Sequence, residues 1–438
     1  MVFSPQWPIA SYAANGTARV TAGPTVGHSP GKTTKAGSTL GLPDVTGSQA
    51  LLVERLDAAD AAAHRTAWLD LMGRALEPQV FFDPDFVLPA AQHLSSRRRP
   101  TFILVWCSEA RGPADLVGIC PVVNRPNPLR VLASVWRHDL STLAFPLLDS
   151  GCAVAAWQAL LAWAAKGLPS ARGLVIPSLP AEGPTAKALR TAAGSDFAIA
   201  ILDRWERAVL RPGQGGAAGL APKGAKELRR QRRRLADLGT LAYVSFRKGD
   251  ALRNGVERFL ALEAAGWKGA ARTALLDHPG PTVFTRTATR LLGTRSLCRV
   301  DALTLNGEPI AMAVILTAGA TDFLWKIAYR EDLARFSPGV QLVLDLTEAQ
   351  MRDGRVGLTD SCAVPHHPMI DRLWRDRLPL VDVVVATRQG SSLAFTVAVA
   401  VERAARRARA GAKQAVLGWR VRRQRATRSQ ARGAARTG

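Results

Sequence analysis

The stretch from Thr321 to Gly354 constrains the fold of this chain more than any other segment. It begins as a mostly buried strand, because large side chains recur at every second position: Phe323, Trp325, Ile327 and Tyr329. Ser337-Pro338-Gly339 then opens an apolar helical pattern, since serine suits an N-cap and proline suits the first helical position. A strand that turns tightly into a helix offers free amides and a helix dipole to a phosphate. A capped strand–turn–helix without a ligand has the same pattern, so both interpretations stay open here.

Cysteine content and charge limit the compartment and the partners. The 438 residues include five scattered cysteines without a paired spacing, which predicts reduced thiols, a cytoplasmic location and no zinc site. No apolar run reaches the roughly 18 residues of a membrane span. The net charge is +23, and residues 401–438 hold twelve basic residues and one acid. This tail is therefore a candidate for contact with nucleic acid or an anionic membrane, and a simple solubilising extension explains it equally.

The order of predicted strands and helices divides the chain into two similar halves. We expect an α/β (α+β) fold, with mixed sheets and helices on both faces. The tail should form one or two short basic helices with a disordered end, and folding should not depend on it. The boundaries are a disordered segment 1–48, a first half 49–215, a basic linker helix 216–238, a second half 239–390 and a basic tail 391–438.

Five segments between Trp136 and Trp374 resemble a bacterial group of acetyltransferases linked to cellulose biosynthesis, the CelD/BcsL type. They are WRHDLSTLAFPLLD, KELRRQRRRLADLG, FLALEAAGWKGAARTAL, WKIAYREDLARFSPGVQL and DSCAVPHHPMIDRLW. The element order of the second half also resembles the GNAT acyltransferase fold. The resemblance implies tandem GNAT halves, as in aminoacyl transferases of the FemAB type. The usual glycine-rich phosphate loop of that family is not present here as such.

The resemblance implies a donor site for acetyl-CoA or another acyl-CoA, and no metal. In the GNAT fold this donor lies where two parallel strands separate, and its pyrophosphate rests on the start of the helix between them. The residues that match are the strand edge Ile327, Ala328 and Tyr329, then Arg335, and the cradle Phe336, Ser337, Pro338, Gly339 and Val340. Tyr329 would stack on the pantetheine arm or hydrogen-bond to it, although a buried strand aromatic explains it equally.

Acyl transfer also needs a base for the proton of the acceptor. We predict His367 as this base with Asp360 orienting it, because Asp360 ends a predicted strand and a histidine beside a carboxylate titrates near neutral pH. Asp371 and Glu263 are the next candidates. Each of these side chains also has a structural explanation, such as a loop histidine or a helix-capping acid. Cys362 is an alternative acylated nucleophile, or a packed core residue.

The acceptor is expected at the junction of the halves. His138 and Asp139 in the first half correspond in place to Trp267 and Lys268 in the GWKG loop of the second half. The catalytic acid stays open, because the family's tyrosine acid on the penultimate helix has no counterpart among the three tyrosines: Tyr12, Tyr243 and Tyr329. Water is one candidate source of that proton.

Three functions agree with these patterns. The first is an acyl-CoA-dependent transferase acting on an amine or hydroxyl of a small molecule or saccharide, with a link to exopolysaccharide or cellulose biosynthesis. The second is an aminoacyl-tRNA-dependent transferase that binds RNA through the basic helix 223–234 and the tail. The third is a catalytically degenerate GNAT pair that serves as an interaction module.

Overall fold

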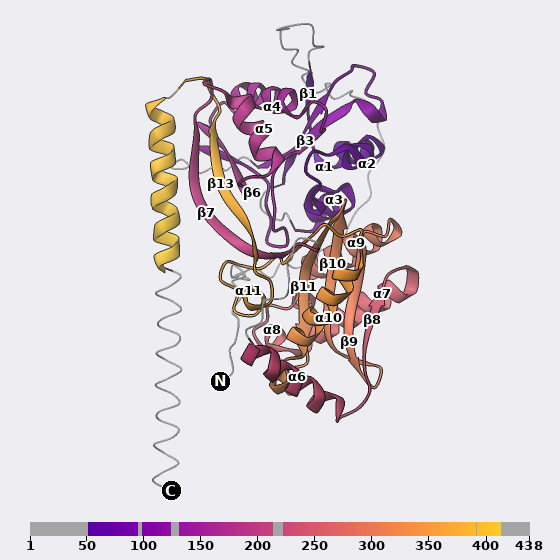
Figure 1. Cartoon of the computed structure of the whole chain (residues 1–438). Helices are drawn as coiled ribbons and strands as arrows, with labels where there is room; N and C mark the ends of the chain where they lie inside the picture. Colours follow the sequence, from indigo (N-terminus) through magenta and orange to yellow (C-terminus); the bar gives the residue numbers. More distant parts are fainter. Residues whose placement is uncertain (1–50, 95–98, 124–130, 213–221, 391, 413–438) are drawn as a thin grey trace, which may run out of the picture.

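A computed structural model describes residues 51–94, 99–123, 131–212, 222–390 and 392–412 (Figure 1). The described strands form one continuous sheet of 13 strands, with helices on both faces. The predicted mixed α/β class is therefore confirmed. The disorder expected for residues 1–48 and for the end of the tail lies outside the described residues. No helix in the described ranges is long and apolar enough to cross a membrane.

The first half forms the upper part of Figure 1, and its helices begin where the sequence supplies a cap. Asp57 accepts hydrogen bonds from the amides of Ala59 and Asp60 at the start of α1, and Asp83 caps α3 ahead of Pro84. The elements are β1 (Leu52–Leu56), α1 (Ala58–Ala63), α2 (Arg65–Arg74), η1 (Val80–Phe82), α3 (Pro84–His93), β2 (Thr101–Trp106), η2 (Pro113–Asp115), β3 (Leu116–Val123), β4 (Leu132–Val135), β5 (Leu147–Leu148), α4 (Ala153–Gly167), β6 (Gly173–Pro180), α5 (Pro184–Ala193) and β7 (Ile199–Leu210).

The second half repeats this order after the basic helix α6. Asn306 and Gly307 form a hairpin turn, and both have a positive φ, which glycine adopts without strain. The elements are α6 (Pro222–Ala236), β8 (Leu241–Phe246), α7 (Gly249–Ala265), α8 (Trp267–Ala270), η3 (Leu275–Asp277), α9 (Pro279–Thr294), β9 (Cys298–Leu305), β10 (Glu308–Ala318), β11 (Thr321–Tyr329), η4 (Glu331–Phe336), α10 (Pro338–Arg352), β12 (Leu358–Asp360), α11 (Ile370–Leu373) and β13 (Asp376–Ala386).

Each half contributes a strand that pairs with strands of the other half, and the order of elements along the chain did not predict this exchange. β13 follows the second half in the chain, yet it lies between β6 and β7 of the first half and pairs antiparallel with both. In return, the end of β7 pairs with β12, through Val209 and Leu210. The last strand of the predicted second half, 239–390, therefore belongs by its pairing to the sheet of the first half. Alternation of apolar residues predicts a strand, but it does not identify the neighbours of that strand.

The start of the tail forms a helix that packs on the core, whereas the sequence predicted a tail on which folding does not depend. Residues 393–412 form a helix along β13 and β7, at the left of Figure 1. Its buried residues Phe395, Ala398 and Val399 pack on the sheet against Leu132, Val175, Val384 and Ala386. The buried Glu402 pairs with Arg406, which also pairs with Asp382 of β13. The helix tolerates its basic residues because these carboxylates offset part of the charge.

Candidate active site

The parallel strands β11 and β12 separate in the second half. They pair at only three positions, which join Thr321–Phe323 to Leu358–Asp360. β11 continues to Tyr329 and stays paired with β10 on its other side. Residues 324–329 therefore present a backbone edge that β12 does not cover. The predicted edge from Ile327 to Tyr329 lies there, and its contact with an acyl donor stays a prediction.

A β-bulge on this edge changes the direction of one side chain. Val314 of β10 pairs with Lys326 and the next residue, Ile315, pairs with Leu324, so Trp325 has no opposite residue on β10. A bulge of this kind breaks the alternation of side chains along a strand. The Lys326 ammonium consequently lies over the Trp325 ring, with Nζ 5.7 Å from the ring centroid.

Lys326 has a lowered pKa of the kind that suits a general base, and it was not among the predicted site residues. Burial and, to a smaller extent, the charge of Lys268 lower the pKa of Lys326 to about 8, while Glu263 and Asp139 act in the opposite direction. Lys326 forms no ion pair with a carboxylate in the described residues. At pH 7 about a tenth of such amines are neutral and able to accept a proton. The available signal was a lone lysine within a strand predicted to be buried.

Glu263 and Lys268 lie beside Lys326, as part of the predicted acceptor side. The buried Glu263 carboxylate accepts hydrogen bonds from Lys268 Nζ at 2.5 Å and from the Leu275 amide at 2.9 Å. Only glycine fits at position 269, because a Cβ there would lie 1.8 Å from the Ala264 carbonyl oxygen. This close approach turns the chain back on α7 and holds Lys268 against Glu263. Trp267, the first residue of α8, is half-buried next to them.

The first half contributes His138 and Asp139 to the same region, and their contact with an acceptor stays a prediction. Burial lowers the pKa of His138 to about 3, with help from the charges of Lys326 and Arg137. The imidazole is therefore neutral; it stacks on Phe86, and its Nε2 is buried without a hydrogen-bond partner in the described part of the chain. A hydrogen bond joins the two halves here, because Trp325 Nε1 donates to the Leu140 carbonyl oxygen at 2.8 Å.

The start of α10 lies beside the unpaired edge of β11. Ser337 occupies the predicted N-cap position, but it adopts a left-handed conformation and its hydroxyl caps nothing. Its carbonyl oxygen accepts hydrogen bonds from the amides of Val340 and Gln341. The Tyr329 ring packs closely on Gly339. A Cβ at position 339 would lie only 3.3 Å from a ring carbon. No acidic residue occurs in the first turn of α10, so nothing in that turn repels an anion.

The remaining residues of the predicted cradle precede this helix. The Arg335 guanidinium lies over the Phe336 ring, 4.7 Å from the ring centroid, and Phe336 and Pro338 are buried. Arg335 itself is exposed and stands at the end of η4, directly before the helix start. Its position suits contact with an anion, and this contact stays a prediction.

The pair predicted as the catalytic base has other contacts. Arg207 of β7 donates to Asp360 Oδ2 at 2.5 Å, and the Cys362 amide donates to Asp360 Oδ1 at 2.9 Å, so both carboxylate oxygens are engaged. His367 Nδ1 accepts from the amides of Met369 and Ile370 at the start of α11, which is a capping contact. Burial lowers the pKa of His367, and Asp371 acts against this shift. These contacts describe an interdomain ion pair and a helix cap, and the catalytic roles stay predictions.

The structure does not support Cys362 as a nucleophile. Burial and the Asp360 charge together raise the pKa of the Cys362 thiol to about 12, so the thiol stays protonated at neutral pH. Thr142 of the first half donates a hydrogen bond to its sulfur at 3.4 Å. Within the described ranges, no three His, Cys, Asp or Glu residues converge as metal ligands.

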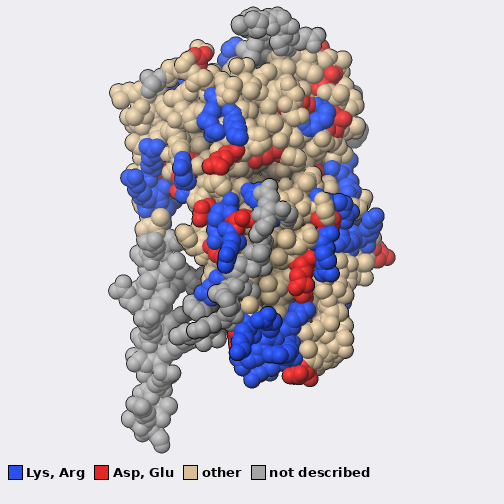
Figure 2. All heavy atoms as spheres, viewed as in Figure 1, with Lys and Arg blue, Asp and Glu red and all other residues tan. Residues whose placement is uncertain are grey.

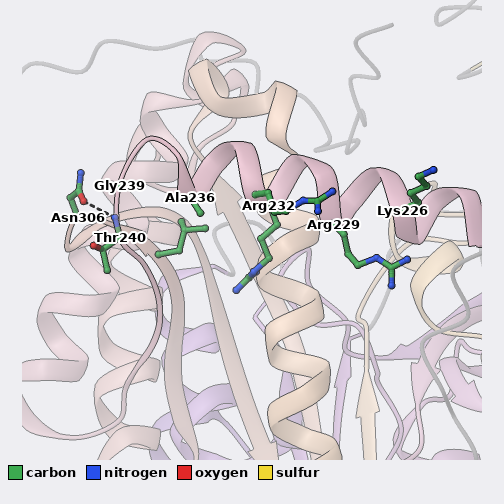
Figure 3. Close-up of a pocket in the computed structure, with 9 residues that line it drawn as sticks. Lys226, Arg229, Arg232, Ala236, Gly239, Thr240 and Asn306 are labelled. Atoms are coloured by element: carbon green, nitrogen blue, oxygen red, sulfur yellow. Dashed lines mark hydrogen bonds between the residues drawn. The ribbon is translucent and has the colours of Figure 1, made fainter.

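A basic groove runs along α6 on the far side of the second half (Figure 3). Its volume is about 1030 Å³, and it is lined by Lys226, Arg229, Arg232, Arg233, Ala236, Gly239, Thr240, Leu241 and Asn306. Arg232 pairs with Asp345 of α10, whereas Lys226, Arg229 and Arg233 form no ion pair with a described acid. Figure 2 shows the resulting positive patch at the bottom of the molecule.

Comparison with known proteins supports the assignment of the second half. Residues 222–360 match the model of the acetyltransferase (GNAT) domain. This stretch is therefore similar to a GNAT domain. The first half repeats the same order of elements, which confirms the predicted tandem GNAT fold. No curated protein matches the sequence.

Several solved structures are similar to the chain, and their likeness is limited to the fold. FemX is 10% identical and covers 76% of this chain and 96% of its own, with a TM-score of 0.48. A tandem GNAT protein of the clavulanic acid biosynthesis pathway is 17% identical and covers 78% of this chain and 99% of its own, with a TM-score of 0.37. A GCN5-related N-acetyltransferase from Kribbella flavida is 11% identical and covers 71% and 97%, with a TM-score of 0.28.

Proposed function

We propose that this protein is an acyl-CoA-dependent acyltransferase whose donor site lies in the second half and whose acceptor binds at the junction of the halves. One observation carries the proposal: β11 leaves β12 after Phe323, so that an open backbone edge lies between the start of α10 and the buried amine of Lys326. An extended thioester arm needs such an edge for hydrogen bonds, and a helix start suits its phosphates.

Each part of the site then has a chemical role. The thioester lies along Ile327 to Tyr329, where a backbone amide stabilises the oxyanion of the tetrahedral intermediate. The neutral Lys326 amine accepts the proton of the attacking amine or hydroxyl as the new bond to the acyl carbon forms. The carbon–sulfur bond then breaks, and the departing thiolate takes a proton from water. Lys326 returns its own proton to solvent and is ready for another cycle.

The acceptor side is formed by residues from both halves. His138 and Asp139 come from the first half, and Trp267, Lys268 and the buried Glu263 come from the second. Polar and aromatic groups in this combination suit an amine or hydroxyl on a small molecule or saccharide. The resemblance to the cellulose-linked acetyltransferases favours acetyl-CoA as donor and a saccharide as acceptor. We place the protein in the cytoplasm because its cysteines have no paired spacing.

Thermal unfolding with acetyl-CoA tests the proposal. The full chain is required, because β13 of the second half pairs only with strands of the first. At 100 times its dissociation constant, a ligand adds about 2.7 kcal/mol to the free energy of unfolding, which raises the melting temperature by several degrees. Acetyl-CoA should give this shift, and free acetate should not. Unchanged melting with millimolar acetyl-, propionyl- and longer acyl-CoA would remove the acyl-CoA donor.

The groove along α6 favours a second candidate, in which the acyl group arrives on tRNA. Unpaired Lys226, Arg229 and Arg233 line the groove, and arginines in this arrangement suit a phosphate backbone. Binding of aminoacyl-tRNA should then weaken steeply with salt, and Arg229→Gln with Arg233→Gln should reduce the salt dependence. Arg253→Gln is the matched control, because that exposed arginine lies on α7. If neither acyl-CoA nor aminoacyl-tRNA binds, the remaining candidate is a catalytically degenerate GNAT pair that serves as an interaction module.

A further inference from the structure

The helix 393–412 has a second apolar face that no described residue covers. Its inner face packs on the sheet through Phe395, Ala398 and Val399. On the outer face, Leu393 is 80% exposed, Val397 52% and Val401 41%. These three residues are four positions apart, so they lie on one stripe of the helix, and Ala400, Ala404 and Ala408 continue it.

Basic side chains flank this apolar stripe. Arg403 and Arg407 are exposed on one side of it; Arg403 also donates to the Ile201 carbonyl oxygen, whereas Arg407 has no acidic partner in the described residues. Arg409 is exposed on the other side and pairs with Glu402. The chain that follows the helix, residues 413–438, contains eight basic residues and no acid. In Figure 2, Lys and Arg atoms gather at the left edge of the molecule, along the lower part of this helix. An apolar stripe between basic residues is the pattern of a helix that lies on a membrane surface.

We propose that the outer face of the helix 393–412 docks on an anionic lipid surface. Leu393, Val397 and Val401 would enter the boundary between headgroups and acyl chains, while Arg403 and Arg407 contact lipid phosphates. The inner face holds the helix on the first half, through Phe395 and the pair Glu402–Arg406. Docking would therefore hold the protein through the sheet on which this helix packs.

The charges favour lipid over the other occupants of such a face. A second copy of this chain would bring Arg403 and Arg407 close to the same residues of its partner, and these like charges repel. An RNA backbone would use the arginines but would leave Leu393, Val397 and Val401 in water. An anionic bilayer satisfies both the apolar stripe and its basic flanks, which is why we commit to it.

Sedimentation with vesicles tests the proposal on the full chain. The protein should bind vesicles of phosphatidylglycerol and phosphatidylcholine at least tenfold more tightly than vesicles of phosphatidylcholine alone. Val397→Asp should lower the affinity for anionic vesicles at least tenfold, because it places a negative charge within the apolar stripe. Its melting temperature should not change, since Val397 is exposed. Val283→Asp is the matched control, because Val283 is a 42% exposed valine on α9, and it should bind as the parent does.

Three results would overturn the proposal. The first is equal binding to neutral and anionic vesicles. The second is unchanged vesicle binding by Val397→Asp, which would show that the apolar stripe is not in contact with lipid. The third is a dimer in solution that Val397→Asp converts to a monomer, which would identify a second copy as the occupant. None of these outcomes depends on acyltransferase activity, so they are independent of the function proposed above.

Discussion

The two halves differ at the gap that opens where their parallel strands separate: side chains bridge this gap in the first half. In the first half, β4 and β6 pair at Leu132–Ser134 and then separate, as β11 and β12 do in the second. This first gap is bridged, because Arg137 Nη1 donates to Ser178 Oγ at 2.8 Å. The Ser178 amide in turn donates to Asp382 of β13 at 2.8 Å. In the second half the corresponding edge of β11 is not covered by β12.

The helices that follow these gaps also differ. Asp149 precedes α4 in the first half; its carboxylate accepts from the Gly151 amide and pairs with Arg74. A carboxylate therefore already occupies the region where an anion would approach α4. The first turn of α10 carries no acid. The comparison teaches that one copy of a repeated fold leaves a strand edge uncovered, while the other copy closes the same features with its own side chains.

The largest expected effect is the fall in turnover when Lys326 is replaced. A general base contributes about 10²–10⁴-fold, so Lys326→Met should lower turnover by that factor, whereas acetyl-CoA should still raise the melting temperature. In the parent, kcat/KM should rise with pH through the lysine pKa of about 8, because the base must be neutral, and Lys326→Met should lose this limb. Lys166→Met, an exposed lysine of the first half, is the control. A rate that instead falls above pH 8 would contradict the base role.

The next largest effect is on the free energy of unfolding, when the helix that covers the sheet of the first half loses a buried side chain. Phe395→Ala should lower the free energy of unfolding by about 3–5 kcal/mol, because the ring is buried on the sheet next to Val384. Leu393→Ala on the same helix should change it by about 0.5 kcal/mol or less, since Leu393 is exposed. Urea unfolding measures both. Equal stability of the two variants, or cooperative unfolding of a chain ended at Gly390, would show that the helix is dispensable after all.

The smallest effect tests the two helix starts directly. Val340→Asp places a carboxylate in the first turn of α10, where repulsion should weaken acetyl-CoA about tenfold or about 1.4 kcal/mol. Folding should not suffer, because an acid at a helix start is favourable. Val154→Asp makes the same change at the start of α4 and should leave the affinity unaltered. Titration calorimetry distinguishes them, and weaker binding by Val154→Asp alone would assign the donor to the first half.

Local order was accessible from the sequence, while the site was accessible only in part. The strand from Thr321 and the helix from Pro338 were predicted because apolar periodicity and capping residues act within a few positions. The bulge at Trp325 was not predicted, because it depends on the register with β10. Lys326 was missed for the same reason: strict alternation would place it on the face opposite Trp325.

The sequence by itself determined the elements, their repeated order and the basic character of α6 and the tail. Tertiary structure decided that β13 crosses into the first half, that Asp360 belongs to Arg207, and that Phe395 is core. The reason is physical. Helix caps and periodicity depend on neighbours along the chain, whereas strand partners, ion pairs and the pKa of a buried lysine depend on groups far apart in sequence that only the folded chain brings together.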